Sequence, residues 1–272
     1  MHRSGVRSAV AFADPEPSGD RWHRGLPGTT LTLILGTADP FLVGGGTGGA
    51  RSAQRALPSL VGGLQTQGAW TRQRGSWAGV HLALDPLMAR RLLAMPAAEL
   101  APGADGHTTV DADAVLPREA RHLAEQLATT PPGTEAAVIA AWARARRDTP
   151  PPRPEVVAAY ALIRGRHGRI RISEVARQVH LSARQLRTVV RAELGIGPKH
   201  LARLARFERA AGLVADGGRS LSDVAQMTGY ADLAHLDAEW RDLVGCPPTV
   251  WLAQERRNLQ ADDGDHGADW VP

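Results

Sequence analysis

Arginine side chains recur at helical spacing between Ala183 and Arg191. Arg184, Arg187 and Arg191 are three and four positions apart, so an α-helix would place all three on one side. A guanidinium group can donate two hydrogen bonds to the edge of a guanine, and Thr188 could contact a thymine methyl group. Taken alone, this face could equally be an ordinary solvated helix surface. The elements that position the arginines therefore decide between the two interpretations.

Residues that could serve an enzyme are scattered along the chain. The ten histidines form no His-X-X-X-His pair, and no Gly-X-Ser-X-Gly elbow occurs. His81 is best explained as a satisfied histidine at a sheet edge, and Cys246 has no base near it in sequence. Asp111 and Asp113 could hold a cation, although two carboxylates in a loop are usually only solvated. We therefore expect no enzymatic activity, no cofactor and no metal site.

The composition describes a folded chain with room for two domains. Its 272 residues are 43% hydrophobic and 22% charged, which allows it to bury a core. The single cysteine excludes an internal disulfide framework. No apolar run approaches the roughly 18 residues that a membrane helix needs. We therefore expect a cytoplasmic protein without disulfides.

Positive charge is concentrated in one part of the chain. The formal net charge of +4 divides into +2 over residues 1–152, +6 over residues 153–257 and −4 over an acidic tail, residues 258–272. Residues 164–219 alone carry +9, almost all of it from arginine. Such concentration indicates a polyanionic partner better than scattered charge does.

The first half of the chain is predicted to have an α+β fold, a small β-sheet followed by helices. Residues 1–25 are polar and interrupted by prolines, so we expect them to be poorly ordered. The glycine run at 44–49 lacks the lysine of a P-loop and is interpreted as a flexible hairpin loop. Hydrophobic periodicity predicts strands at 29–35, 41–43, 59–64 and 77–84, and helices at 87–95, 118–127 and 135–147.

Prolines separate this half from a second, all-helical one. Four prolines between Pro150 and Pro154 predict a stiff linker over residues 148–154, with halves that fold separately on either side. Ser173 and Ser182 are placed to cap two helices, and Gly217 follows the end of a long one. Helices are predicted at 155–164, 172–179, 182–194, 199–215, 221–227 and 232–244, followed by a short final one.

An internal repeat organises the helical half. Ile-Ser-Glu-Val-Ala at 172–176 matches Leu-Ser-Asp-Val-Ala at 221–225, 49 positions later. A turn and a second helix follow each segment, and each second helix ends near a Gly-X-X-Pro sequence, at 195–198 and 245–248. Two short helices at a tight turn, with a small alanine where they cross, are typical of a helix-turn-helix. The repeat therefore predicts two helix-turn-helix motifs joined by a long helix.

The helical half resembles the DNA-binding domain of AraC/XylS-type transcriptional regulators over about residues 155–254. Residues 26–147 resemble, less closely, the sensor or dimerisation half that such regulators carry in front. The resemblance rests on Leu-Ser-Ala-Arg-Gln-Leu at 181–186, Gly-Ile-Gly-Pro at 195–198, Leu-Ala-Arg-Phe-Glu-Arg-Ala at 204–210, Val-Ala at 224–225, Gly-Tyr at 229–230, His-Leu at 235–236, Trp-Arg at 240–241 and Gly-Cys-Pro-Pro at 245–248.

The resemblance implies sequence-specific binding of double-stranded promoter DNA, with the second helix of each motif in the major groove. It also implies RNA polymerase, a small-molecule effector and a second copy of the chain as partners. Trp70 and Trp77 could line an effector pocket, although core packing is the better explanation for them. The residues expected to face DNA are Ser182, Ala183, Arg184, Arg187, Thr188, Arg191, Leu233, Ala234 and Asp237.

The chain departs from the family pattern at several positions. His180 stands in the first turn where many members have glycine, so a left-handed backbone there would be strained. Arginine is frequent in the family at the positions of Thr188 and Ala238, so two expected DNA contacts are missing. Val190 replaces a usual aromatic residue, although the site stays apolar.

The second motif is predicted to contribute little to base recognition. Residues 220–257 carry a net charge of −3. Leu233, Ala234 and Ala238 offer only apolar contact, and the Asp237 carboxylate would repel phosphate. We therefore expect the first motif to read the sequence and the second to be weakly specific or structural. The acidic second motif also leaves an alternative open, a protein–protein adaptor whose DNA binding has decayed.

Overall fold

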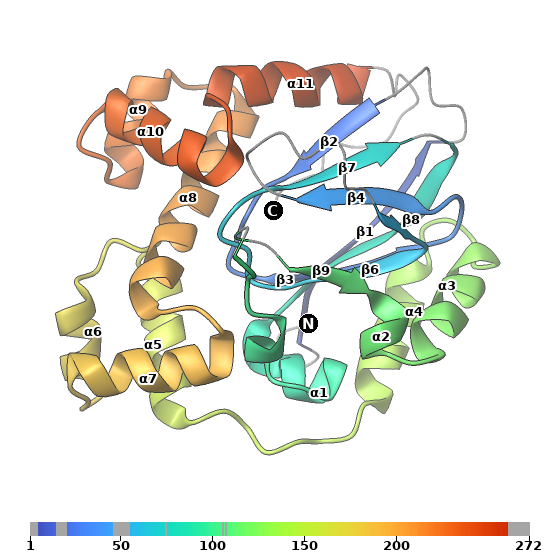
Figure 1. The fold of residues 1–272 in the computed structure, drawn as a ribbon, viewed down its shortest axis with the longest axis horizontal. Helices are drawn as coiled ribbons and strands as arrows, with labels where there is room; N and C mark the ends of the chain where they lie inside the picture. The colour runs from blue at the N-terminus through green and yellow to red at the C-terminus, as the bar shows by residue number, and fades with distance from the viewer. Residues whose placement is uncertain are drawn as a thin grey trace.

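The computed structural model describes residues 5–14, 21–45, 55–73, 75–104, 106 and 108–260. It consists of a mixed α/β part built on two antiparallel sheets, followed by an all-helical part (Figure 1). This confirms the predicted fold class of both halves. The glycine run expected to form a flexible loop falls mostly outside the described residues.

Two antiparallel sheets form the centre of the first half. In one, the order is β1-β8-β3-β6-β9, and in the other it is β2-β7-β4-β5. Leu31, Leu33 and Leu35 of β3 are fully buried beneath the helices, whereas Ile34 points toward the second sheet and packs near Phe41. The strands are β1 (Val6–Asp14), β2 (Arg21–Gly25), β3 (Leu31–Gly36), β4 (Phe41–Gly45), β5 (Arg55–Leu57), β6 (Ser59–Gly62), β7 (Ala69–Gln73), β8 (Trp77–Leu84) and β9 (Thr109–Asp111).

The prediction that residues 1–25 are poorly ordered is wrong for two described stretches. β1 pairs with β8 along nearly its whole length, from Val6 opposite Leu84 to Asp14 opposite Trp77. β2 pairs with β7 over five residues. Pairing with strands distant in sequence orders segments whose local composition does not predict strands, because the backbone hydrogen bonds come from elsewhere in the chain.

Short helices follow the sheets, and the two aspartates considered as cation ligands lie at the start of one of them. Asp111 caps α2, where its Oδ1 accepts a hydrogen bond from the Asp113 backbone N–H at 2.9 Å. Asp113 pairs with Arg121 at 2.7 Å, so both carboxylates already have partners. The elements are η1 (Pro86–Met88), α1 (Ala89–Leu93), η2 (Ala97–Leu100), α2 (Ala112–Val115), α3 (Glu119–Ala128) and α4 (Glu135–Ala145).

The helical half contains both predicted motifs, which we call the first motif (α6 and α7) and the second motif (α9 and α10). The long helix α8 joins them (Figure 1). Among the described helices, none is long and apolar enough to cross a membrane. The elements are α5 (Pro154–Gly165), α6 (Ile172–Gln178), α7 (Ala183–Leu194), α8 (Pro198–Asp216), α9 (Leu221–Thr228), α10 (Leu233–Val244) and α11 (Pro248–Gln260).

Helix boundaries follow local signals in most cases. Ser182 forms a capping box with Gln185 at the start of α7, as predicted, and Gly217 ends α8 with a φ of 68°. Ser173 does not cap α6, contrary to prediction, because the helix begins at Ile172 and Arg171 occupies the cap position. His180 has a φ of 56°, so the first turn does carry a left-handed histidine.

The two halves share one contiguous hydrophobic core, although the proline linker predicts separate folding units. Thr29, in the loop before β3, is fully buried against the helical half. Its backbone N–H and hydroxyl both donate to Glu208 Oε2 of α8, at 3.1 and 2.5 Å. Its carbonyl accepts a hydrogen bond from the Tyr160 hydroxyl of α5 at 2.9 Å. Polar groups of both halves that docking buries are therefore hydrogen-bonded to each other.

Replacing Glu208 with alanine should lower the free energy of unfolding by about 1–3 kcal/mol, because two buried donors on Thr29 lose their acceptor. Urea denaturation followed by circular dichroism measures the change. Asp216→Ala, at an exposed position on the same helix, is the matched control and should change stability little. Equal effects of the two substitutions would contradict the assigned role of Glu208.

Candidate nucleic-acid interface

The first motif presents its charged face to solvent. Leu186 and Val190 of α7 are buried against the motif's own core, with Val175 and Ala176 of α6. This burial fixes which side of α7 faces outward, since residues three and four apart share a side. The small side chain of Ala176 is 3% exposed, so it belongs to this buried contact.

The arginines of α7 are exposed and available to a partner. Arg184, Arg187 and Arg191 are all exposed, and among the described residues their guanidinium groups make no hydrogen bond or ion pair. Thr188 is also exposed, and its hydroxyl donates to the Arg184 carbonyl at 3.1 Å, which leaves the methyl group free. A row of unpaired arginines along one helix can donate to phosphates and to base edges.

Ser182 and Ala183 lie at the start of the same face. Both residues are exposed, so the structure brings together all six residues predicted to face DNA in the first motif. The Ser182 hydroxyl is engaged in the capping box, since it accepts from the Gln185 backbone at 3.2 Å and donates to the Gln185 side chain at 2.8 Å. Its structural role is thus to fix the start of α7.

Helix α10 is the second helix of its motif, as α7 is in the first motif, but its exposed surface is different. Leu233, Ala234 and Ala238 are exposed on α10. Asp237 is paired with Arg241 one turn later, at 2.6 Å between Oδ2 and Nη1. Arg241 is the only arginine of α10, which has no lysine, so the pair engages its one guanidinium group.

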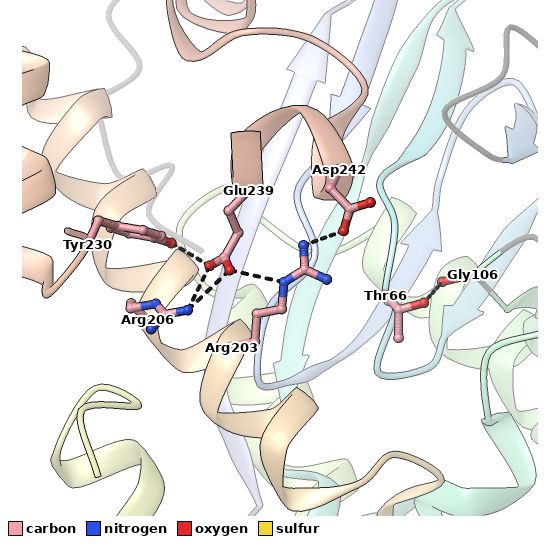
Figure 2. A network of polar contacts seen from close by, with 7 residues as sticks. All are labelled: Thr66, Gly106, Arg203, Arg206, Tyr230, Glu239 and Asp242. Carbon is pink, nitrogen blue, oxygen red and sulfur yellow. Dashed lines mark hydrogen bonds and ion pairs between the residues drawn. The ribbon is translucent and has the colours of Figure 1, made fainter. Parts of the chain in front are cut away.

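A polar network anchors α10 to α8 (Figure 2). The Glu239 side chain, 9% exposed, accepts hydrogen bonds from Arg203 at 3.2 Å, Arg206 at 3.1 Å and the Tyr230 hydroxyl at 2.7 Å. Asp242 also pairs with Arg203. Burial and the neighbouring Glu239 carboxylate raise the pKa of Tyr230, so its hydroxyl stays protonated and donates.

This network was not foreseen from the sequence, where the acidic residues of the second motif appear as surface charge. Glu239 and Asp242 balance arginines of α8, and Asp237 balances Arg241. Asp232 caps the start of α10, and Asp223 accepts a hydrogen bond from the hydroxyl of Ser220, which caps α9. Three of the acidic residues behind the net charge of −3 are thus paired with arginines, and two more are engaged at helix starts. The one available signal was the i to i+3 spacing of Arg203 and Arg206, which places both on one side of α8.

The mixed α/β half contacts the ends of both outward-facing helices. Arg90 of α1 forms two hydrogen bonds, each 3.1 Å, with the buried Glu193 near the end of α7. At the end of α10, the Gly68 N–H donates to the Leu243 carbonyl at 2.7 Å, and Arg24 donates to the Val244 carbonyl at 2.8 Å. Such donors satisfy carbonyl groups that a helix end leaves without intrahelical partners.

Residues considered for an effector or a site in the first half have structural roles. Trp70 lies under the Arg24 guanidinium at 3.8 Å, and Trp77 packs against Phe12 and Phe41. His81 lies on β8, which runs between β1 and β3, so its predicted place at a sheet edge is wrong. Burial, together with the charge of His23, lowers the pKa of His81 to about 4.

A cleft of about 620 Å³ lies along α8 between the two motifs. Its lining includes Ile172, Lys199, His200, Arg203 and Glu239. It belongs to the helical half, whereas an effector pocket was expected in residues 26–147. Among the described residues, no group of three or more histidine, cysteine, aspartate or glutamate side chains is placed to hold a metal ion.

Comparison with known proteins agrees with this geometry. Residues 175–254 match a family described as a helix-turn-helix domain. No curated protein sequence matches the chain significantly. An apo variant of ToxT from Vibrio cholerae strain SCE256 is 9% identical, with a TM-score of 0.53 over 90% of this chain and 96% of that one. ToxT from Vibrio cholerae O395 is 8% identical, with a TM-score of 0.52 over 92% and 98%. These similarities show a shared two-part fold.

Replacing Glu239 with alanine should lower the free energy of unfolding by about 1–3 kcal/mol, because Arg203, Arg206 and Tyr230 lose a common acceptor. Thermal or urea unfolding of the full chain measures this loss. Asp242→Ala removes a more exposed partner of the same Arg203 and should change stability by about 0–1 kcal/mol. If the Asp242 variant were the less stable of the two, the central role of Glu239 would be refuted.

Proposed function

We propose that this chain is a sequence-specific transcriptional regulator that binds promoter DNA, because its C-terminal segment is a helix-turn-helix domain of the AraC type. The first motif reads bases, and the second contributes less. The observation that carries the proposal is the row of exposed, unpaired arginines on α7, on the outward side of a helix-turn-helix. The domain family and the shared fold support the coarser statement, a DNA-binding transcriptional regulator.

The adaptor alternative loses its main support. It depends on an acidic second motif, whereas the carboxylates of that motif are paired with arginines or engaged at helix starts. A decayed DNA-binding domain would also have no need to keep Arg184, Arg187 and Arg191 exposed together on α7. We therefore favour DNA over a protein as the partner of the helical half.

The mixed α/β half is proposed as the sensor, joined through residues 148–154. Its contacts with the ends of α7 and α10 support this assignment, because a change in that half would reach both motifs. The effector, RNA polymerase and a second copy of the chain remain proposed partners, and the absence of catalytic activity remains a prediction.

Salt dependence separates a DNA-binding regulator from an adaptor. The affinity of the full chain for random duplex DNA should fall by orders of magnitude between about 50 and 200 mM salt, because each phosphate contact releases counterions. Fluorescence anisotropy with a labelled duplex measures the affinity at each concentration. An adaptor would bind no duplex at either salt concentration, and that result would reject the proposal.

Arg184→Ala and Arg187→Ala should each weaken specific binding by roughly ten-fold or more, because a bidentate contact with guanine is worth about 1–3 kcal/mol. Arg144→Ala, an equal loss of charge at an exposed site on α4, is the control and should have little effect. Titrations against specific and scrambled duplexes distinguish loss of sequence preference from loss of general affinity.

Asp237→Ala should act in the opposite direction in the same titrations. It removes a charge that repels phosphate and releases Arg241 from its ion pair, so binding at low salt should strengthen modestly while sequence preference stays. Loss of preference in the Asp237 variant, with preference intact in both arginine variants, would mean that the wrong helix is assigned as the reader.

A further inference from the structure

Exposed apolar side chains flank the turn of the second motif. Leu233, the first residue of α10, is 40% exposed, and Met227, near the end of α9, is 45% exposed. Ala234 and Ala238 extend the same exposed surface along α10. Leucine and methionine are usually buried, and the first motif has no exposed large apolar residue among those described.

The internal repeat relates this surface to the reading face of α7. Both α7 and α10 have 12 residues, each is capped by the side chain of the preceding residue, and each ends at a left-handed glycine, Gly195 or Gly245. A shift of 50 positions therefore superimposes one helix on the other in sequence. Leu233, Ala234 and Ala238 then occupy the places of Ala183, Arg184 and Thr188.

Polar groups on this face of α10 are already engaged within the protein. The Asp237 carboxylate is bound to Arg241 at 2.6 Å, and the Asp232 side chain accepts from the His235 backbone N–H at 2.7 Å. The His235 ring packs edge-on against Tyr230, with the ring centres 5.2 Å apart, which directs it toward the turn. The face that corresponds to the reading face of α7 is thus apolar apart from one internal ion pair.

Only one apolar feature in the major groove matches such a surface. Each base pair presents donors and acceptors there, and thymine alone adds a C5 methyl group. We propose that the second motif recognises thymine methyl groups, contacted by Leu233, Ala234 and Ala238, so that its half-site is rich in A·T pairs. The inference rests on the proposed function and assigns the second motif a defined chemistry of its own.

The test uses the full chain and a duplex selected by it from a random library. Each thymine of the selected duplex is replaced in turn by deoxyuridine, which pairs identically but lacks the methyl group. Replacement at the thymines facing α10 should weaken binding by about four-fold per methyl, the ratio that corresponds to about 0.8 kcal/mol per buried methylene-sized group. The Arg184→Ala variant identifies the half-site bound by the first motif, because the substitution relaxes sequence preference only in that half-site.

A variant of the protein links the methyl effect to its partner. Leu233→Ala should weaken binding to the thymine duplex and should reduce or abolish its difference from the deoxyuridine duplex. Val157→Ala, a matched exposed apolar residue on α5, should keep both affinities. Because both side chains are exposed, neither substitution is expected to unfold the chain.

The outcomes separate the inference from the function on which it rests. If the chain selects a sequence and its binding is insensitive to deoxyuridine in both half-sites, the thymine proposal is refuted and the regulator proposal stands. Full sensitivity to deoxyuridine in the Leu233 variant would equally refute the assigned contact. If no sequence is selected and no salt-dependent binding occurs, the proposed function itself fails.

Discussion

Helix α8 packs against both motifs and against the mixed α/β half. Ten of its nineteen residues are buried, and Phe207 packs against Trp240 of the second motif with ring centres 5.0 Å apart. Glu208, on the same helix, holds the Thr29 loop of the mixed α/β half. One helix therefore contacts both motifs and the preceding half, so the two outward helices cannot move independently of α8 without exposing apolar surface.

The two motifs use one scaffold for two chemistries. Leu186 and Val190 in α7, and Leu236 and Trp240 in α10, fill equivalent buried positions, so the helices are held alike. The outward positions are free of this packing requirement and differ in chemistry, since α7 carries unpaired arginines, whereas α10 carries leucine, alanines and an aspartate that is paired with Arg241. Fold and recognition can diverge in this way because they depend on opposite sides of the same helix.

The position of the mixed α/β half gives it access to both motifs. It bonds to α7 through Arg90 and Glu193, and to the last carbonyls of α10 through Arg24 and Gly68. These contacts lie at the ends of the helices, away from Arg184 and Arg187 near the start of α7. The docked mixed α/β half therefore leaves the outward face of α7 exposed while it constrains where that face points.

Elements whose signals are local could be predicted from the sequence alone. Helical periodicity, the Ser182 cap and the repeat at 172 and 221 predicted the helices, both motifs and the exposed row Arg184, Arg187 and Arg191. Long-range contacts were decided only by the tertiary structure. β1 forms because it pairs with β8, and the carboxylates of Glu239 and Asp237 have ion-pair partners because arginines from α8 or one turn away reach them. A strand partner or a charge partner is a matter of distance in space, which local composition does not encode.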